Sequence, residues 1–315
     1  MVPSHSIAPV DLRNGVRRAT LLNLGYAEHQ VRATTLPKPF HGVRSASEPR
    51  TLFELARAFA PLMGPDDAFS HVTALRLYGL PTRTEWTVSE PLHVIGRGAD
   101  WTHRGRGVVG HQTRFGAIPI RIVDGVRVID PVRVMLQAAS VLPLDEVVAI
   151  GDAMVTPPRD DSGGAPLAPL VTHGDLLAVA EVVAGARGVK RFREAVALVR
   201  VGARSRPESI MRVTAVRAGF PEPVIERPVL DRLGHEIGRP DLTFELRRAS
   251  GTTLLGNEYE GDGHRVDRDR FRYDIRRRER MEIEGGVPIL RTMAADLFPS
   301  RAPYLASLRA RAGFH

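Results

Sequence analysis

The chain has 315 residues, 43% of them hydrophobic, which is enough for two domains that each have a core. Its formal net charge is +8 and its isoelectric point is near 10.6, values that favour a polyanionic partner such as nucleic acid. Cysteine is absent, which excludes disulfides, cysteine-ligated zinc and thiol nucleophiles.

Two further properties of the composition concern the partner and the compartment. Lys38 and Lys190 are the only lysines, so the charge comes from arginine, which a GC-rich genome also produces without any role in nucleic-acid binding. No uninterrupted run of about 18 apolar residues occurs, and the first residues lack the basic flank and apolar core of a secretory signal. We therefore expect a cytoplasmic protein without a membrane partner.

The segment from Arg18 to Arg32 predicts a helix, a turn at Gly25 and a second helix. This outline is typical of a helix-turn-helix, and the segment from Lys38 to Arg44 would follow as a wing. The predicted DNA-facing residues of the second helix are His29, Gln30 and Arg32. Any helical hairpin gives the same pattern, so a structural role is the alternative. We assign residues 1–50 to this winged-helix-like module.

Residues 51–155 mix helical and strand patterns and predict an α+β domain. Helices are expected at 52–59, 70–78 and 132–139, and strands at 92–95 and 118–122. Asp130 and Pro131 supply a cap and a first helical residue for the last of these helices. No metal-ligand spacing is evident among the histidines of this region, so we expect a structural role for each of them: His71, His93, His103 and His111.

A proline- and glycine-rich stretch at 156–166 predicts an exposed loop. Helical patterns follow at 175–184 and 190–199, and a second break falls at 201–207. We therefore assign residues 156–200 to a linker with bracing helices, and residues 201–315 to a C-terminal domain.

The C-terminal domain predicts the order helix, three strands, helix, strand, helix. The first helix spans 207–218, and a hairpin turns at 231–234 between strands around Val229 and Ile237. The third strand covers 254–260, the charged helix 267–284 and the last strand 287–291. Together with the first two regions, this pattern predicts a mixed α/β chain.

Acidic residues collect at the ends of these strands. Asp241 follows the second strand, and Glu258 and Glu260 share one face of the third because alternate side chains of a strand point the same way. Like charges this close raise one another's pKa unless a cation lies between them, although a solvated loop would also hold them apart. Glu208 lies in the first turn of the preceding helix, where an acid also compensates the helix dipole. Carboxylates on neighbouring strands suit metal-dependent phosphodiester cleavage, and oxygen ligands make Mg²⁺ or Mn²⁺ the expected ion.

As an ordered set, these residues resemble the very-short-patch-repair (Vsr-like) endonucleases and their relatives of unknown function in the PD-(D/E)xK nuclease superfamily. The likeness runs from Glu208 to Leu297 and includes Pro240-Asp241 and the run Glu258-Tyr259-Glu260-Gly261. It implies a restriction-endonuclease-like αβββαβα domain that acts on DNA, most simply a duplex. The catalytic set that it implies is Glu208, Asp241, Glu258, Glu260 and His264, with Asp241, Glu258 and Glu260 at the metal.

One departure from the superfamily concerns its motif lysine, because no lysine occurs after Lys190 and Glu260 takes that place. The stabilisation that the lysine gives is then expected from Arg291 or from an arginine of the charged helix. That helix holds eight arginines and four acids between Arg265 and Arg280. The alternative is a solvated helix face with internal pairs such as Asp274 with Arg278. The predicted phosphate contacts are Arg265, Arg277, Arg278 and Arg291.

The first 150 residues resemble the AbiEi-type antitoxin and regulator proteins of actinobacteria, through the helix-turn-helix outline, Gly42-Val43 and the run from Ser70 to Pro81. This resemblance implies DNA binding and autoregulation, not catalysis, and we also expect a protein partner encoded nearby. The leading hypothesis is a DNA-binding protein with a metal-dependent endonuclease domain. The first alternative is a non-enzymatic antitoxin or transcriptional regulator whose nuclease-like domain only binds nucleic acid. The second is an RNA-directed nuclease or toxin-like element.

Overall fold

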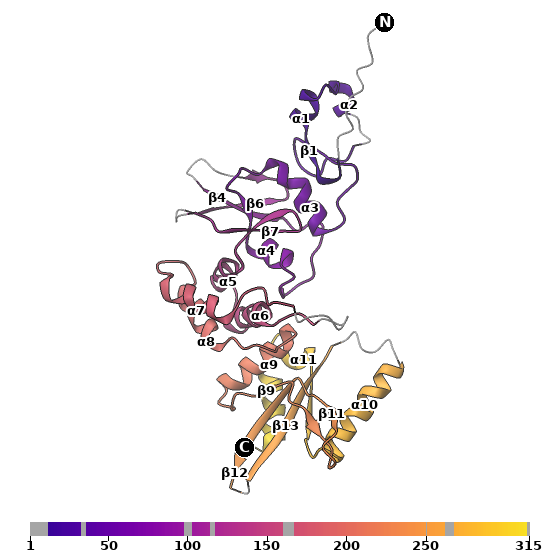
Figure 1. Cartoon of the computed structure of the whole chain (residues 1–315), viewed down its shortest axis with the longest axis vertical. Coiled ribbons are helices and arrows are strands. Elements are labelled where there is room, and N and C mark those ends of the chain that lie inside the picture. The colour runs from indigo at the N-terminus through magenta and orange to yellow at the C-terminus, as the bar shows by residue number, and fades with distance from the viewer. Residues whose placement is uncertain are drawn as a thin grey trace. The chain divides into compact units, whose positions relative to one another are not determined.

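The computed structural model describes residues 12–32, 36–97, 103–113, 117–159, 167–249, 251–261 and 268–313. The chain is mixed α/β and divides into two compact units, Met1–Ala138 and Ala139–His315 (Figure 1). This division falls before the expected boundary at 155 and gives helix α6 (Leu144–Val155) to the second unit. None of the described helices is long and apolar enough to cross a membrane.

The first unit begins with a helical hairpin and a small strand pair. The elements are η1 (Leu12–Asn14), β1 (Val16–Arg17), α1 (Arg18–Asn23), α2 (Glu28–Arg32) and β2 (Val43–Arg44). Gly25 lies between the helices with a φ of +89°, in the left-handed region that favours glycine. The expected helix, turn and helix are therefore present. The segment expected as a wing contributes β2, which pairs antiparallel with β1.

A six-stranded sheet with the order β5-β6-β4-β3-β8-β7 forms the main part of the first unit. Its strands are β3 (Ala68–Phe69), β4 (Leu92–Arg97), β5 (Arg104–Gly105), β6 (Val108–Thr113), β7 (Ile120–Val123) and β8 (Val126–Ile129). The accompanying helices are α3 (Leu52–Phe59), η2 (Ala60–Leu62), α4 (His71–Leu77) and α5 (Pro131–Ala139). As predicted, Asp130 caps α5, since its Oδ1 accepts a hydrogen bond from the Val132 backbone at 3.0 Å.

A helical layer opens the second unit, with α6 followed by α7 (His173–Val182), α8 (Val189–Leu198) and α9 (Arg206–Arg217). A buried ion pair joins α6 to α9, because Arg212 Nη2 lies 3.0 Å from Asp152 Oδ2 and both side chains are 0% exposed. The helices expected in the linker are packed into this layer through buried Leu176 and Phe192. Residues 160–166 of the proline- and glycine-rich loop lie outside the described residues.

A four-stranded sheet with the order β14-β13-β12-β9 forms the core of the second unit. Its strands are β9 (Val224–Ile225), β12 (Leu242–Arg248), β13 (Gly251–Glu260) and β14 (Ile289–Met293). The first three pair antiparallel, whereas β13 and β14 run parallel with the crossover helix α10 (Arg268–Ile283) between them in the sequence. The expected hairpin is confirmed as β10 (Val229–Leu230) and β11 (Glu236–Gly238), but it forms a separate sheet. The prediction that it supplies strands of the main sheet is therefore wrong, and β9 and β12 take that place.

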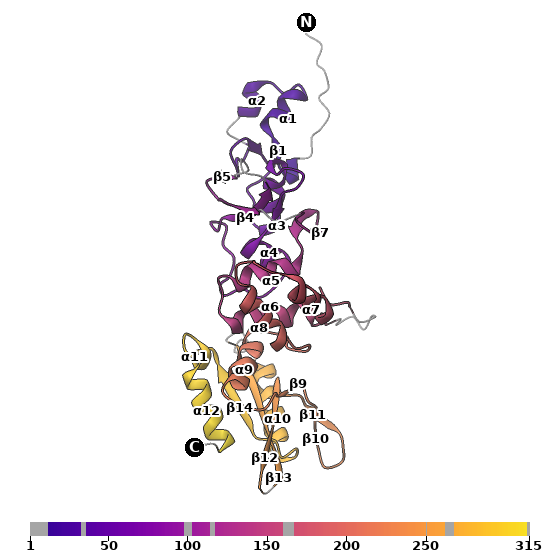
Figure 2. The ribbon, with the colours of Figure 1, turned by 90° about the vertical axis from the view of Figure 1, so that its left-hand side faces the viewer.

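Alternating residues give the main sheet two buried faces. Phe244 and Leu255 pack on one face with α9, α11 (Ala294–Leu297) and α12 (Ala302–Ala312), and α12 lies beside β14 (Figure 2). Leu254 packs on the other face with Met281 of α10 and Ile237 of β11, and Figure 1 shows α10 next to β11. Because Leu254, Glu258 and Glu260 are separated by even numbers of residues, both glutamates emerge on the α10 face.

Candidate functional site

Charged side chains line a cavity of ≈ 930 Å³ in the second unit, at the end of β13. Among the described residues, seven acids and six arginines line it: Glu208, Glu226, Glu236, Asp241, Glu258, Glu260 and Asp274, with Arg159, Arg204, Arg239, Arg277, Arg278 and Arg291. The cavity thus brings together the predicted site residues of the C-terminal domain that the structure describes. Two further predicted residues, His264 and Arg265, lie outside the described residues.

Strand pairing places Asp241 next to the β13 glutamates. Asp241 directly precedes β12, whose next residue, Leu242, pairs with Asn257, the neighbour of Glu258. Its Oδ2 accepts a hydrogen bond from the Tyr259 backbone at 2.7 Å, which ties the carboxylate to β13. Asp241 therefore begins a strand of the main sheet, and the prediction that it ends one is corrected. The prediction was wrong because the β10–β11 hairpin, expected as part of the main sheet, forms a separate sheet.

Arginines of α10 and β14 pair with both glutamates of β13. Arg277 Nη2 lies 2.8 Å from Glu258 Oε1, and Arg278 Nη2 lies 2.7 Å from Glu260 Oε1. Arg291 Nε donates to Glu260 Oε1 at 2.8 Å. Arg278 thus contacts β13 instead of forming the internal helix pair with Asp274, and Asp274 lies 4.0 Å from Arg277. Three of the arginines predicted to meet phosphate, Arg277, Arg278 and Arg291, are therefore paired with acids of β13.

The arginine pairs affect the two glutamates differently. Burial raises the pKa of Glu258, and the nearby charges of Arg277 and Arg278 offset this only in part. Burial also acts to raise the pKa of Glu260, but the hydrogen bond from Arg291 and the charge of Arg278 outweigh it and lower that pKa below its ordinary value. Glu260 is therefore firmly ionised at neutral pH.

Glu208 and Asp241 lack such compensation. Each arginine of the cavity has an acidic partner among the other five acids. Among the described residues, no arginine or lysine side chain forms an ion pair within 4.0 Å with the Glu208 or Asp241 carboxylate. Burial and then repulsion from Asp241 raise the pKa of Glu208 to about 7. Burial, together with repulsion from Glu258, raises the pKa of Asp241 to about 6.

Glu208 also has a structural role at the start of α9. Its Oε1 accepts a hydrogen bond from Ser205 Oγ at 2.8 Å, and its Oε2 accepts one from the Arg204 backbone at 2.8 Å. Ser205 Oγ in turn accepts from the Glu208 backbone at 3.3 Å, so the two residues cap the helix together. The helix-end function and the place in the cavity are compatible, because the cap holds the carboxylate at the cavity wall.

Glu226 belongs to the site but was missed in the sequence. It follows β9 with a φ of +48°, a left-handed conformation that is uncommon for residues other than glycine. Its backbone N–H donates to the Asp241 carbonyl at 3.1 Å, and its carboxylate pairs with Arg159 and with Arg204, the latter at 3.0 Å. Its charge further raises the pKa of Glu208 and of Asp241. A two-residue strand leaves no periodic signal that could have located it.

The acids of the cavity do not converge on one point as the structure stands. Among the described residues, only His71, His93 and His111 of the first unit form a group of three metal-ligand atoms within 4.8 Å of one another. A cation shared by Asp241 and Glu258 would therefore compete with Arg277 and Arg278 for the Glu258 carboxylate.

For His71, His93 and His111 of the first unit, the expectation of no metal-ligand spacing is wrong. His103 instead pairs with Asp67 at 2.9 Å.

A second cavity, of ≈ 790 Å³, lies in the first unit and has a basic lining that includes Arg17, Arg18, Arg32, Lys38, His41 and Arg44. Arg32 is exposed and pairs with Glu28 at 2.7 Å. Of the other predicted DNA-facing residues, His29 is exposed, and Gln30 accepts a hydrogen bond from the Ala27 backbone at 2.8 Å. Neither His29 nor Gln30 lines this cavity, so only Arg32 of the predicted set belongs to it.

A scan against models of protein families, a search of curated proteins and a search of solved structures found no match to this chain.

The raised pKa of Glu208 predicts a specific dependence of stability on pH. Its pKa is 4.5 ordinarily and about 7 in the fold, so the proton is bound more tightly in the folded state. The resulting stabilisation is complete below pH 4.5 and is lost as the pH rises to about 7, at a cost of roughly 3 kcal/mol. Between pH 4.5 and 8, the free energy of unfolding measured in urea should fall less in Glu208→Gln than in the parent.

The control variant is Glu279→Gln, which replaces an exposed glutamate outside the cavity and should follow the parent at every pH. Equal pH dependence in the parent and in Glu208→Gln would contradict the assignment of this titration to Glu208.

Proposed function

We propose that this chain is a DNA-binding protein whose second unit hydrolyses phosphodiester bonds with Mg²⁺ or Mn²⁺. The observation that carries the proposal is a pair of carboxylates with raised pKa values and no arginine ion-pair partner, Glu208 and Asp241, in a cavity whose arginines all pair with other acids. One divalent cation brings the two positive charges that this pair lacks. Carboxylate oxygens are also the ligands that Mg²⁺ and Mn²⁺ prefer.

The topology of the second unit supports the same proposal. Helix α9 precedes an antiparallel run of β9, β12 and β13, and α10 then leads to β14, which is parallel to β13. Apart from the β10–β11 hairpin between β9 and β12, this order agrees with the αβββαβα order that the resemblance implies, and it supports the proposal. Asp241, immediately before β12, and Glu258 of the adjacent strand β13 lie where the resemblance to the Vsr-like endonucleases implies two metal ligands.

Residues of the cavity have different roles in the proposed reaction. Asp241, Glu258 and Glu208 supply oxygen ligands, and Tyr259 holds Asp241 in place through its backbone N–H. A bound Mg²⁺ or Mn²⁺ would neutralise charge on the scissile phosphate and lower the pKa of a water molecule beside it. His264, which lies outside the described residues, remains the predicted acid or base.

Arginine replaces the missing motif lysine in this account. Glu260 stands where the superfamily has lysine, and Arg278 and Arg291 both pair with it. The position therefore carries a net positive group once the three side chains are taken together. Guanidinium groups also fit phosphate oxygens in a bidentate manner, so Arg277, Arg278 and Arg291 are suited to hold the DNA backbone at the cavity.

One observation favours the non-enzymatic alternative. Both β13 glutamates pair with arginines, so arginine side chains already supply positive charge at Glu258, where the proposed cation would bind. In an antitoxin or transcriptional regulator of the AbiEi type, these pairs would be permanent and the domain would only bind nucleic acid. Cleavage in the presence of metal distinguishes the two functions.

The first test of the proposal is metal-dependent cleavage by the full chain. Plasmid, linear, mismatched and single-stranded DNA should be incubated with Mg²⁺ or Mn²⁺ and with chelator. We expect nicking or cutting that stops with chelator and falls to background in Glu258→Gln, because the amide keeps the shape of the side chain but loses the charge that holds the ion. Glu279→Gln is the matched control and should cut like the parent.

Circular dichroism of Glu258→Gln should match the parent, which excludes unfolding as the cause of lost cleavage. A parent protein that binds duplex DNA but cuts none of the four substrates with either metal would overturn the nuclease proposal in favour of the regulator.

The second test concerns the basic cavity of the first unit. Each lost phosphate contact should lower the slope of log affinity against log salt by about 1, because fewer counterions are released on binding. Duplex binding by full-length Arg32→Ala/Lys38→Ala should therefore weaken at low salt and lose about two units of slope. Lys190→Ala/Arg309→Ala removes the same two residue types at exposed positions outside both cavities and should leave the slope unchanged.

An unchanged slope in the first double variant would mean that this cavity does not contact phosphate.

A further inference from the structure

Three histidines from separate elements meet on one side of the sheet in the first unit. His71 is the first residue of α4, His93 lies in β4, and His111 lies in β6. β4 and β6 are parallel and Ile95 pairs with His111, so His93 and His111 belong to the same face with an offset of two residues. The cluster thus depends on sheet register and on where α4 begins, which is why no short sequence motif reveals it.

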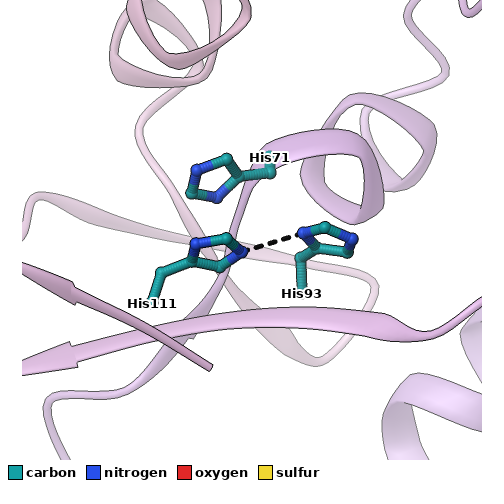
Figure 3. Close-up of side chains that lie close together, drawn as sticks. All are labelled: His71, His93 and His111. Carbon is teal, nitrogen blue, oxygen red and sulfur yellow. Dashed lines mark hydrogen bonds between the residues drawn. The ribbon is translucent and has the colours of Figure 1, made fainter. Parts of the chain in front are cut away.

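A nitrogen of His93 faces a nitrogen of His111, and the His71 ring lies over the His111 ring (Figure 3). His93 Nδ1 lies 2.9 Å from His111 Nε2, and one ligand nitrogen from each of the three rings falls within 4.8 Å of the others. The rings of His71 and His111 stack with centroids 3.6 Å apart. Two ring nitrogens of a tetrahedral Zn²⁺ site, each bonded at about 2.0–2.1 Å, lie roughly 3.3 Å apart, close to the 2.9 Å between His93 Nδ1 and His111 Nε2. The stacked His71 ring would turn out of its stack on His111 to bring a nitrogen to the same ion.

The surrounding chain holds His71 in an unusual conformation. Its φ is +53°, in the left-handed region where a non-glycine residue is strained by about 1 kcal/mol or more. The conformation is fixed by a hydrogen bond from its backbone N–H to Gln137 Oε1 at 2.9 Å, and Ser70 Oγ lies 3.0 Å from His71 Nδ1. The start of α4 is thereby directed so that the imidazole reaches the two strand histidines.

The electrostatic surroundings leave the imidazoles neutral. Burial and then repulsion from His111 and His93 lower the pKa of His71 to about 3, and burial followed by repulsion from His93 lowers that of His111 to about 4. Burial lowers the pKa of His93 as well. A neutral imidazole has one lone pair free for a metal, whereas a protonated one has none.

We propose that His71, His93 and His111 bind one Zn²⁺ ion, with water at the remaining coordination position. Imidazole is a borderline ligand that suits Zn²⁺, whereas Mg²⁺ and Mn²⁺ prefer oxygen, so this site differs in chemistry from the acidic cavity of the second unit. The ion takes the place of the proton shared between His93 Nδ1 and His111 Nε2. That proton moves through solvent to the other nitrogen of the donating ring, which stays neutral.

The test uses the full chain freed of metal with chelator and titrated with Zn²⁺ in a calorimeter. We expect one tight site per chain, with the affinity lowered at least tenfold in His111→Asn and in His93→Gln. His41→Asn changes an exposed histidine of the same unit and should bind Zn²⁺ like the parent. Circular dichroism of each variant checks that the fold survives.

A second measurement needs no variant. Co²⁺ in the parent should give the intense visible absorption of a four-coordinate site, and X-ray absorption of the Zn²⁺ form should show three imidazole nitrogens. Absence of stoichiometric Zn²⁺ binding, equal binding by His111→Asn, or fewer than three imidazole ligands would each overturn the proposal. Neither readout involves DNA cleavage, so its outcome is independent of the nuclease proposal.

Discussion

Negative charge buried in one cavity is the constraint on which the second unit depends. An ionised carboxylate that leaves water must be paired, hydrogen-bonded or protonated, because the desolvation cost of an isolated charge is several kcal/mol. Arginines from α10 and β14 meet this need for Glu258 and Glu260. Glu208 and Asp241 are left with pKa values of about 7 and about 6, near the point at which protonation and ionisation balance. A bound cation would lower both pKa values and so keep both carboxylates fully ionised at neutral pH.

The fold keeps these acids at the cavity at some cost. Glu226 adopts a left-handed conformation and binds the Asp241 carbonyl, and Ser205 caps α9 together with Glu208. Helix α9 is itself anchored by the fully buried pair of Arg212 and Asp152. Such a pair contributes little net stability compared with apolar packing, but removing one partner is costly. It therefore fixes the position of α9, and with it the position of Glu208, relative to α6.

The sequence predicted local features better than pairings between distant segments. Helix α3 was predicted at its observed bounds and the cap at Asp130 was predicted correctly, because both depend on neighbouring residues. The common face of Glu258 and Glu260 follows from strand geometry alone. Strand β12 was missed although Leu242, Phe244 and Leu246 alternate as a strand requires, since the nearby hairpin gave a stronger turn signal. Glu226 and the histidine cluster depend on contacts between remote segments, which no local pattern contains.

The central claim is that Asp241 and its neighbours hold a divalent cation, and calorimetric titration with Mn²⁺ at pH 8 tests it most directly. At that pH Glu208 and Asp241, with pKa values of about 7 and about 6, are mostly ionised, so proton competition is small. Both proteins in the comparison carry His111→Asn, which removes the histidine cluster as a second binding site. One of them is otherwise the parent sequence, and the other also carries Asp241→Asn. The account predicts one Mn²⁺ per parent chain and an affinity at least tenfold lower for Asp241→Asn. Equal Mn²⁺ affinity in the two proteins would contradict it.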